Sequence, residues 1–166
     1  MFGCILIAFV LAGLGDQTGT LTFTKPAAWT DRAAASSMRV AEFVVPRASG
    51  DSEDGEVIVY YFGGGGGSAD ANLQRWTSQF QSTKDPVRTT ATVNGLKLTS
   101  LDVSGTYVAE MRPGSAEHYN KPGYRMRATV VETPKGPYFI KLTGPAKTID
   151  SAGAAFEQFL HSLAFK

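Results

Sequence analysis

Cysteine is almost missing from this chain, because its 166 residues include only one, Cys4. That residue lies in an uncharged segment, Met1–Leu14, which has the character of a secretory signal. If the segment is removed, the mature chain has no disulfide, no thiolate nucleophile and no cysteine-ligated metal. Stability must then come from the hydrophobic core alone.

Histidines and catalytic motifs are also scarce. The two histidines are His118 and His161, and the second suits the C-terminal end of a helix, where positive charge is favoured. The sequence has no Gly-x-Ser-x-Gly elbow, no His-Glu-x-x-His pair and no other nucleophile motif. We therefore expect a protein that is not an enzyme, with no catalytic residues, no cofactor and no metal.

Neither sign of charge dominates the chain, because its formal net charge is only +1. Nucleic-acid binders normally carry a strongly basic face or tail, so this balance counts against a nucleic-acid partner. The composition is 43% apolar and 19% charged, which is typical of a folded globular protein. A chain of this length is sufficient for one domain with a substantial core.

A long hydrophobic run is missing as well. Met1–Leu14 is shorter than the roughly 20 residues that a membrane-spanning helix needs, so we expect no stable transmembrane span. Its length fits the core of an export signal, with Gly13 and Gly15 as small residues near a cleavage site. No Lys or Arg precedes the run, so a buried strand or helix of the fold is the alternative. We predict a signal or N-terminal hydrophobic segment at residues 1–15, a single domain at residues 16–166, and export to the periplasm or envelope.

What the sequence does contain is a succession of strand patterns. Gly19–Thr24 alternates apolar residues with threonines, and Ser37–Val45 is a second strand that ends before Pro46. Val57–Phe62 is apolar at every position, so we expect it to be covered on both faces in the middle of a sheet. Trp29 is expected to pack back over this sheet.

Asn94-Gly95 is the strongest hairpin signal in the chain, because both positions of a type I′ turn need positive φ. Short turns of this kind make neighbouring strands antiparallel. The strands predicted in this half of the chain are Val87–Val93, Leu96–Val103, Thr106–Met111, Tyr124–Thr133 and Tyr138–Thr143.

Two helices are predicted from 3.6-residue spacing. Ser68 is suited to be the N-cap of the first, which the apolar spacing carries to about Thr83. Thr148 is suited to cap the second, whose apolar stripe runs from Ile149 to Leu163. The expected fold class is therefore α+β: a three-layer α/β/α sandwich with a mostly antiparallel sheet and one long helix on each face.

Two stretches of the chain are similar to the PsbP-like fold family. Leu21–Trp29 resembles the strand, proline and tryptophan that open that fold, and Tyr138–Pro145 followed by Phe156–Leu163 resembles its final strand, turn and helix. The family includes the extrinsic photosystem protein PsbP, a Ran-binding nuclear import factor and bacterial exported proteins of unknown role. The resemblance implies an adaptor or assembly factor rather than an enzyme, and it supplies no catalytic residues.

Two segments with ligand-binding character are better explained as loops. Gly63–Gly67 stands between a strand and a helix, where backbone N–H groups can cradle a phosphate. It is followed by Ser68-Ala69 without the lysine of a P-loop, so we interpret it as a connector. The acidic residues of Arg47–Glu56 do not have the spacing of an EF-hand, so we interpret them as part of a solvated hairpin loop.

The long polar loop Arg112–Gly123 is the best candidate for a binding site, since loops of this length often carry function. On the following strand, Arg125 and Arg127 project to one face, and Lys141 adds to a small basic patch if it shares that face. The alternative is that the arginine stems cover the sheet while their heads stay in water. The candidate partner-binding residues are Arg112, Glu117, His118, Tyr119, Arg125 and Arg127.

The function that these patterns favour is a non-catalytic binding or assembly module of the cell envelope. Its partner would be another protein or an envelope component. One alternative is a small-molecule-binding protein or hydrolytic enzyme with a cleft near His118, which requires that residue to lie in a concave pocket close to a carboxylate. The other alternative is a structural envelope protein without a specific ligand.

Overall fold

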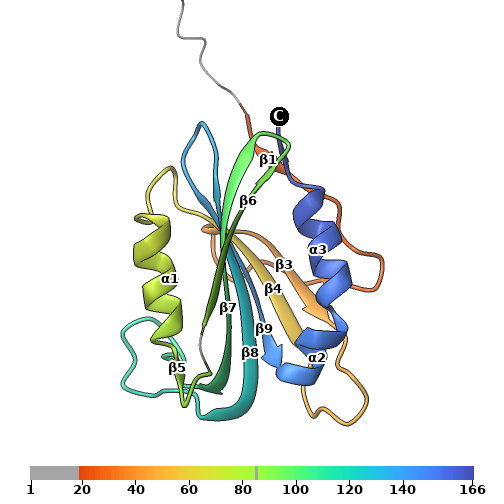
Figure 1. Ribbon diagram of the computed structural model, residues 1–166, viewed down its shortest axis with the longest axis vertical. Helices are drawn as coiled ribbons and strands as arrows, with labels where there is room; N and C mark the ends of the chain where they lie inside the picture. Colours follow the sequence, from red (N-terminus) through yellow and green to blue (C-terminus); the bar gives the residue numbers. More distant parts are fainter. Residues whose placement is uncertain (1–18, 85) are drawn as a thin grey trace, which may run out of the picture.

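The computed structural model of the chain describes residues 19–84 and 86–166, so the predicted segment at residues 1–15, with Cys4, lies outside the described residues. A large antiparallel sheet dominates the described part (Figure 1). Its strands are β2 (Thr30–Asp31), β3 (Arg39–Val45), β4 (Gly55–Tyr61), β5 (Phe80–Gln81), β6 (Val87–Val93), β7 (Leu96–Tyr107), β8 (Lys121–Glu132) and β9 (Tyr138–Pro145). They lie in the order β2-β3-β4-β9-β8-β7-β5, and β6 also pairs with β7.

Most of the predicted strands are confirmed with small shifts at their ends, and the apolar β4 lies inside the sheet, between β3 and β9. The Asn94-Gly95 hairpin is also confirmed, because both residues have positive φ, 48° and 82°. The strand predicted at Gly19–Thr24 is limited to β1 (Leu21–Thr22), which forms a separate pair with β10 (Ala164–Phe165).

β7 differs from the prediction, because it continues through Ser104 and Gly105 to Tyr107 without a turn. Glycine is needed at position 105 because β5 passes close to it: a Cβ there would lie 2.5 Å from the carbonyl oxygen of Gln81. The separate strand predicted at Thr106–Met111 is therefore wrong, and the chain after Tyr107 forms a loop.

The first helix, α1, spans Ala69–Thr77 and begins as predicted. The hydroxyl of Ser68 accepts a hydrogen bond from the backbone N–H of Ala71 at 3.2 Å, as an N-cap does. The helix ends earlier than predicted because Phe80 enters β5 and pairs with Tyr107.

The second predicted helix is divided into α2 (Ala146–Ser151) and α3 (Gly153–His161). Thr148 is not the N-cap, because the helix starts after Pro145 and the Thr148 hydroxyl donates to a carboxylate oxygen of Asp51. One long helix on each face is therefore not confirmed, since α1 and α3 have 9 residues each and α2 has 6. Within the described ranges, no helix combines the length and the hydrophobicity that a membrane crossing requires.

The helices lie on opposite faces of the sheet (Figure 1). α1 packs on β7 and β8, where its Leu73 and Trp76 join Met126 in one buried cluster. α3 covers the other face, where Phe156 packs in a second cluster with Trp29, which lies over the sheet as predicted. Because α1 covers only part of this face, the surface over β3, much of β4 and the part of β9 beyond Phe139 is left to other segments.

Candidate functional site

The segment between β7 and β8, residues 108–120, is folded back on itself as an irregular hairpin. The backbone N–H of Tyr119 donates to the carbonyl oxygen of Ala109 at 2.9 Å. The carboxylate of Glu110 accepts the N–H of Gly114 at 2.7 Å, which closes the tip of the hairpin. We call this segment the 108–120 loop, and its own hydrogen bonds hold its shape.

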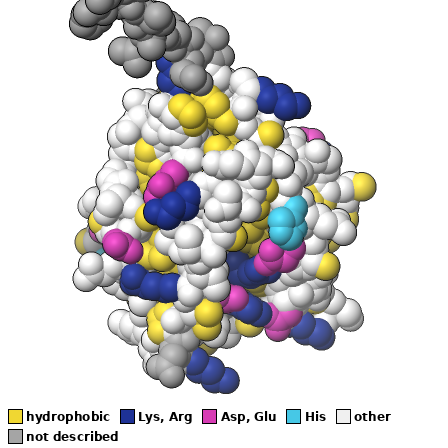
Figure 2. All heavy atoms as spheres, turned by 45° about the horizontal axis from the view of Figure 1, so that its top comes forward, with side chains coloured by type: hydrophobic (Ala, Val, Ile, Leu, Met, Phe, Trp, Pro, Cys, Tyr) yellow, Lys and Arg dark blue, Asp and Glu magenta, His cyan; other side chains and the backbone are white. Residues whose placement is uncertain are grey.

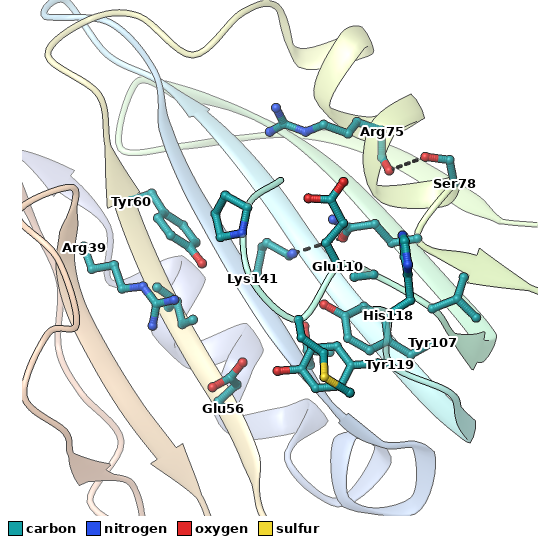
Figure 3. Close-up of a pocket in the computed structure, with 17 residues that line it drawn as sticks. Arg39, Glu56, Tyr60, Arg75, Ser78, Tyr107, Glu110, His118, Tyr119 and Lys141 are labelled. Atoms are coloured by element: carbon teal, nitrogen blue, oxygen red, sulfur yellow. Dashed lines mark hydrogen bonds between the residues drawn. The ribbon is translucent and has the colours of Figure 1, made fainter. Parts of the chain in front are cut away.

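A cavity of about 590 Å³ lies between this loop and the face of the sheet that α1 leaves uncovered (Figure 3). We call it the loop pocket. Its floor contains Glu56 and Tyr60 from β4 and Lys141 from β9, and Arg39 of β3 stands at its edge. The C-terminal end of α1 and the 108–120 loop form the remaining walls. Binding sites for small organic molecules are typically about 300–1,000 Å³, so the pocket has a suitable size.

Lys141 is the unusual residue of the pocket floor. Its neighbours in β9, Ile140 and Leu142, are fully buried on the opposite face, whereas its ammonium lies on the pocket side and donates to Oε1 of Gln79 at 3.2 Å. Among the described residues, no carboxylate forms an ion pair with it. Burial lowers the pKa of the Lys141 ammonium to about 8, although the charge of Glu56 acts in the opposite direction.

Glu42 balances the arginines at the edge of the pocket. Glu42 is only 4% exposed, and its carboxylate accepts hydrogen bonds from Arg39 at 2.8 Å and from Arg32 at 3.3 Å. Burial alone would raise the pKa of Glu42, but the two guanidinium groups hold that pKa below its ordinary value. Arg32 also binds Glu56 at 3.3 Å. The charges of these four residues therefore compensate one another.

Three tyrosines line the loop pocket. Tyr60 stands on the β4 side, and Tyr107 and Tyr119 stack on the other side with ring centroids 5.7 Å apart. The hydroxyl groups of Tyr60 and Tyr107 point towards the interior from opposite sides (Figure 3). Burial raises the pKa of Tyr60 and of Tyr107, so both hydroxyls stay protonated at neutral pH and can donate hydrogen bonds.

The predicted partner-binding residues are divided between two faces of the sheet. His118 and Tyr119 line the loop pocket. His118 is exposed, and its Nδ1 lies 3.1 Å from the carbonyl oxygen of Ala116. Arg112 and Glu117 form an exposed ion pair at 3.5 Å on the same loop. Two of the six candidates thus reach a cavity that can hold a ligand.

Arg125 and Arg127 lie on the opposite face, next to α2 and α3. The guanidinium group of Arg125 binds Asp102 and Asp150, and that of Arg127 binds Glu157. Since Asp150 belongs to α2 and Glu157 to α3, these ion pairs connect the sheet to both helices.

Lys141 does not share the face of Arg125 and Arg127, which was the condition for a basic patch. β8 and β9 pair so that Arg127 stands opposite Leu142, and Ala128 stands opposite Lys141. Directly opposed residues of an antiparallel pair project to the same face. Lys141 therefore lies on the face of Ala128, away from the arginines. A pairing of β8 with β9 shifted by one residue would have placed it on the arginine face.

The glycine run Gly63–Gly67 has a packing role. A Cβ at Gly66 would lie 2.6 Å from the ring of Phe139. Asn72 of α1 ties the run in place, because its side-chain amide donates to the carbonyl oxygens of Gly66 at 2.8 Å and of Ser68 at 2.9 Å. The close approach of the Phe139 ring explains the glycine at position 66.

The acidic residues of the loop at 47–56 contact different neighbours rather than a common centre. Asp51 accepts a hydrogen bond from the backbone N–H of Thr148 at 2.9 Å, and Glu53 binds the ammonium of Lys121 at 2.5 Å. In the part of the chain that the structure describes, no group of three or more metal-ligating side chains is arranged to hold an ion.

Several pocket residues, among them Gln79, Tyr60 and Lys141, are not indicated by any sequence motif. One signal for the pocket is nevertheless present in β9. Lys141 interrupts an otherwise apolar strand between Phe139 and Thr143, which share its face. A lysine at the centre of a central strand indicates that this position is not covered by apolar packing.

On the face drawn in Figure 2, several Lys and Arg side chains lie beside Asp or Glu side chains. Exposed ion pairs elsewhere on the surface, such as Lys97 with Glu132 at 3.1 Å, follow the same rule. Lys141 differs from this pattern, because no carboxylate of the described residues forms an ion pair with its ammonium.

Comparisons with known proteins support the fold. No protein-family model matches the chain, and no curated protein is significantly similar to it. The solved structure of PA94, a protein of unknown function from Pseudomonas aeruginosa, matches with a TM-score of 0.53 and 17% identity, over 87% of this chain and 96% of that chain. Cyanobacterial PsbP (CyanoP) from Synechocystis sp. PCC 6803 matches with a TM-score of 0.51 and 14% identity, over 95% of this chain and 98% of that chain. At these identities, the likeness shows the fold alone.

Proposed function

We propose that this chain, which has a PsbP-like fold, is a non-catalytic binding module of the cell envelope whose ligand site is the loop pocket. The observation that carries the proposal is a cavity of about 590 Å³ with a lysine on its floor that is not ion-paired to any described residue. Partly burying a charge without an ion-pair partner is unfavourable, and perturbed groups of this kind are concentrated at functional sites.

A non-catalytic role is favoured by the way the polar groups of the 108–120 loop are used. The Nδ1 atom of His118 lies against the carbonyl oxygen of Ala116, and the carboxylate of Glu110 is bound to the N–H of Gly114. General acid–base catalysis needs such groups to be held against each other or against a substrate. Among the described residues, no carboxylate is hydrogen-bonded to His118, the contact through which a carboxylate orients a histidine as a general base.

The envelope location is supported by the uncharged segment Met1–Leu14, which lies outside the described residues. Fractionation of cells that express the full chain tests this part of the proposal. We expect a shortened protein in the periplasmic or envelope fraction. Unshortened protein in the cytoplasmic fraction would contradict export.

The ligand site itself can be tested by blocking the pocket. Cys4 is the only native cysteine and can be replaced by serine, so a bulky maleimide can then be attached to a Ser78→Cys variant at the pocket rim. Ser151→Cys provides a matched control. Both serines are exposed, and each donates to a helix carbonyl oxygen, of Arg75 in one case and of Lys147 in the other.

Ligands from a small-molecule library are then detected by amide chemical-shift changes. We expect these changes at loop-pocket residues such as Tyr107 and Lys141. The adduct at Ser78→Cys is expected to abolish them, and the adduct at Ser151→Cys to leave them unchanged. Binding that survives the first adduct, or shift changes confined to the opposite face of the sheet, would contradict the proposed site.

A further inference from the structure

Two cations of the loop pocket are held by neutral amides instead of carboxylates. Within residues 19–84 and 86–166, the side chain of Lys141 donates only to Oε1 of Gln79, at 3.2 Å, and that of Arg75 donates only to Oδ1 of Asn72, at 2.6 Å. An ammonium has three N–H donors and a guanidinium has five. Both groups therefore keep donors and positive charge that this part of the chain does not compensate.

The carboxylates that line the pocket are engaged with other groups. Glu56 binds Arg32 at 3.3 Å, and Glu110 accepts the N–H of Gly114 at 2.7 Å. Neither carboxylate forms a hydrogen bond or an ion pair with Lys141. The position next to the Lys141 ammonium therefore suits a negatively charged group that comes from outside the chain.

Neutral hydrogen-bond donors surround the same space. The hydroxyls of Tyr60 and Tyr107 point into the pocket, and neither is hydrogen-bonded to another described residue (Figure 3). Hydrogen bonds from such donors and from an ammonium to an ionised oxygen are the strong ones. The rings of Tyr107 and Tyr119 provide apolar surface beside these donors, which suits a carbon skeleton.

We infer that the loop pocket binds a small organic oxyanion, a molecule that carries one carboxylate or phosphate group on a ring or short chain. The oxyanion accepts hydrogen bonds from Lys141 and from the hydroxyls of Tyr60 and Tyr107. Arg75 adds positive charge at the rim, and the carbon skeleton lies against Tyr119. This inference rests on the proposed function, because it names the ligand class of the same pocket.

The protonation of Lys141 agrees with this role. Burial lowers the pKa of Lys141 to about 8, Arg75 and Arg39 also lower it, and Glu56 raises it. Lys141 is therefore mostly charged at pH 7, and binding of an oxyanion would favour the charged form further. The other titratable groups around the pocket are Glu110, His118, Tyr60, Tyr107 and Tyr119.

Calorimetric titration of the full-length protein at pH 7 and low salt tests the inference. The probes are benzoate and phenyl phosphate, with benzamide and phenol as neutral counterparts and inorganic phosphate as the anion without a ring. Lys141→Met removes the charge and keeps most of the length of the side chain. If this variant does not fold, Lys141→Gln is used in its place. Lys147→Met is the matched control, because Lys147 is exposed and its ammonium donates to the carbonyl oxygen of Ser49.

We expect at least one of the two ring anions to bind wild type and Lys147→Met at least tenfold more tightly than its neutral counterpart. The Lys141 variant is expected to lose tenfold or more in affinity for that anion. A preference for phenyl phosphate would identify a phosphate ligand, and a preference for benzoate would identify a carboxylate ligand. Tighter binding of inorganic phosphate than of either ring anion would overturn the organic part of the inference.

Two results would overturn the oxyanion inference as a whole: no binding of either anion, or anion binding that Lys141→Met leaves unchanged. The proposed function is decided separately by the blocked-pocket experiment with Ser78→Cys. If neutral library compounds bind and the adduct prevents this, the loop pocket remains the ligand site although its ligand is not an oxyanion. If no compound shifts the pocket resonances, the proposed function fails as well.

Discussion

The ammonium of Lys141 and the side-chain oxygen of Gln79, 3.2 Å apart, connect the centre of the sheet to the segment that follows α1. A neutral amide satisfies one donor of the lysine but leaves its charge uncompensated. For stability alone, an apolar side chain at this position would serve better than a half-buried cation without an ion-pair partner. The cost of keeping a lysine here is therefore best explained by a ligand.

Lys141→Met is expected to raise the free energy of unfolding by about 1 kcal/mol at pH 7, because the variant no longer holds an unpaired charge at a half-buried position. The difference should shrink as the pH rises. Between the folded pKa of about 8 and the ordinary value of 10.5, the unfolded wild-type chain holds more protons than the folded one, so wild-type stability rises with pH relative to the variant.

Chemical denaturation of both proteins from pH 7 to pH 10 measures this change. Lys147→Met, at an exposed lysine, is expected to follow wild type at every pH. A Lys141→Met variant that is less stable than wild type at pH 7 would show that Lys141 has a structural role instead.

Gly136, in the turn between β8 and β9, approaches the glycine run closely. Its φ is 102°, and a Cβ there would overlap the Cα of Gly64. We expect Gly136→Ala to lower the free energy of unfolding by more than about 2 kcal/mol, because backbone strain adds to a clash. At Gly63, φ is 62° and a Cβ meets no atom within 4 Å, so Gly63→Ala should cost only about 1 kcal/mol. If both variants lower the free energy of unfolding by the same amount, the close approach of Gly136 to Gly64 does not explain the loss.

His118 and Tyr119 should contribute differently to stability. His118 is exposed, so His118→Ala is expected to change the free energy of unfolding by less than about 0.5 kcal/mol. Tyr119→Ala loses the stack on Tyr107 and the ring contact with the ammonium of Lys121 at 5.3 Å, which together stabilise by about 1–2 kcal/mol. Titration is expected to show weaker binding of pocket ligands in both variants. Unchanged affinity in both would place the site elsewhere.

Arg125 and Asp102 should be coupled in stability and independent of the pocket. Their side chains are 31% and 30% exposed, so a double-mutant cycle with Arg125→Met and Asp102→Asn is expected to give about 1 kcal/mol, less at high salt. The affinity for benzoate or phenyl phosphate should not change, because this pair lies on the opposite face of the sheet. A reduced affinity for these anions in Arg125→Met would show that Arg125 takes part in ligand binding.

Local sequence signals were sufficient for most of the sheet. The apolar run Val57–Phe62 indicates a strand inside the sheet, and the type I′ turn at Asn94-Gly95 determines which strands pair next to it. The start of α1 could also be predicted, since a Ser68 cap acts on a backbone N–H only three residues away.

Features that depend on contacts between distant residues were not predictable in this way. Phe80 has helical spacing with Trp76, yet its pairing with Tyr107 places it in β5. The orientation of Lys141 depends on the register of β8 against β9, and the loop pocket exists because α1 ends early and the 108–120 loop folds over β9. The candidate loop was therefore identified from the sequence, but the face on which the lysine opposite it lies could not be predicted.

The most direct measurement is an NMR titration of the lysine side-chain ¹³Cε resonances, with Lys141→Met used for assignment. In the free protein, we expect the pKa of Lys141 to lie near 8 rather than at the ordinary value of 10.5. With saturating benzoate or phenyl phosphate, this pKa should rise, because an oxyanion binds the protonated ammonium more tightly. A Lys141 pKa that is ordinary in the free protein and unchanged by either anion would contradict the assignment of the loop pocket as an oxyanion site.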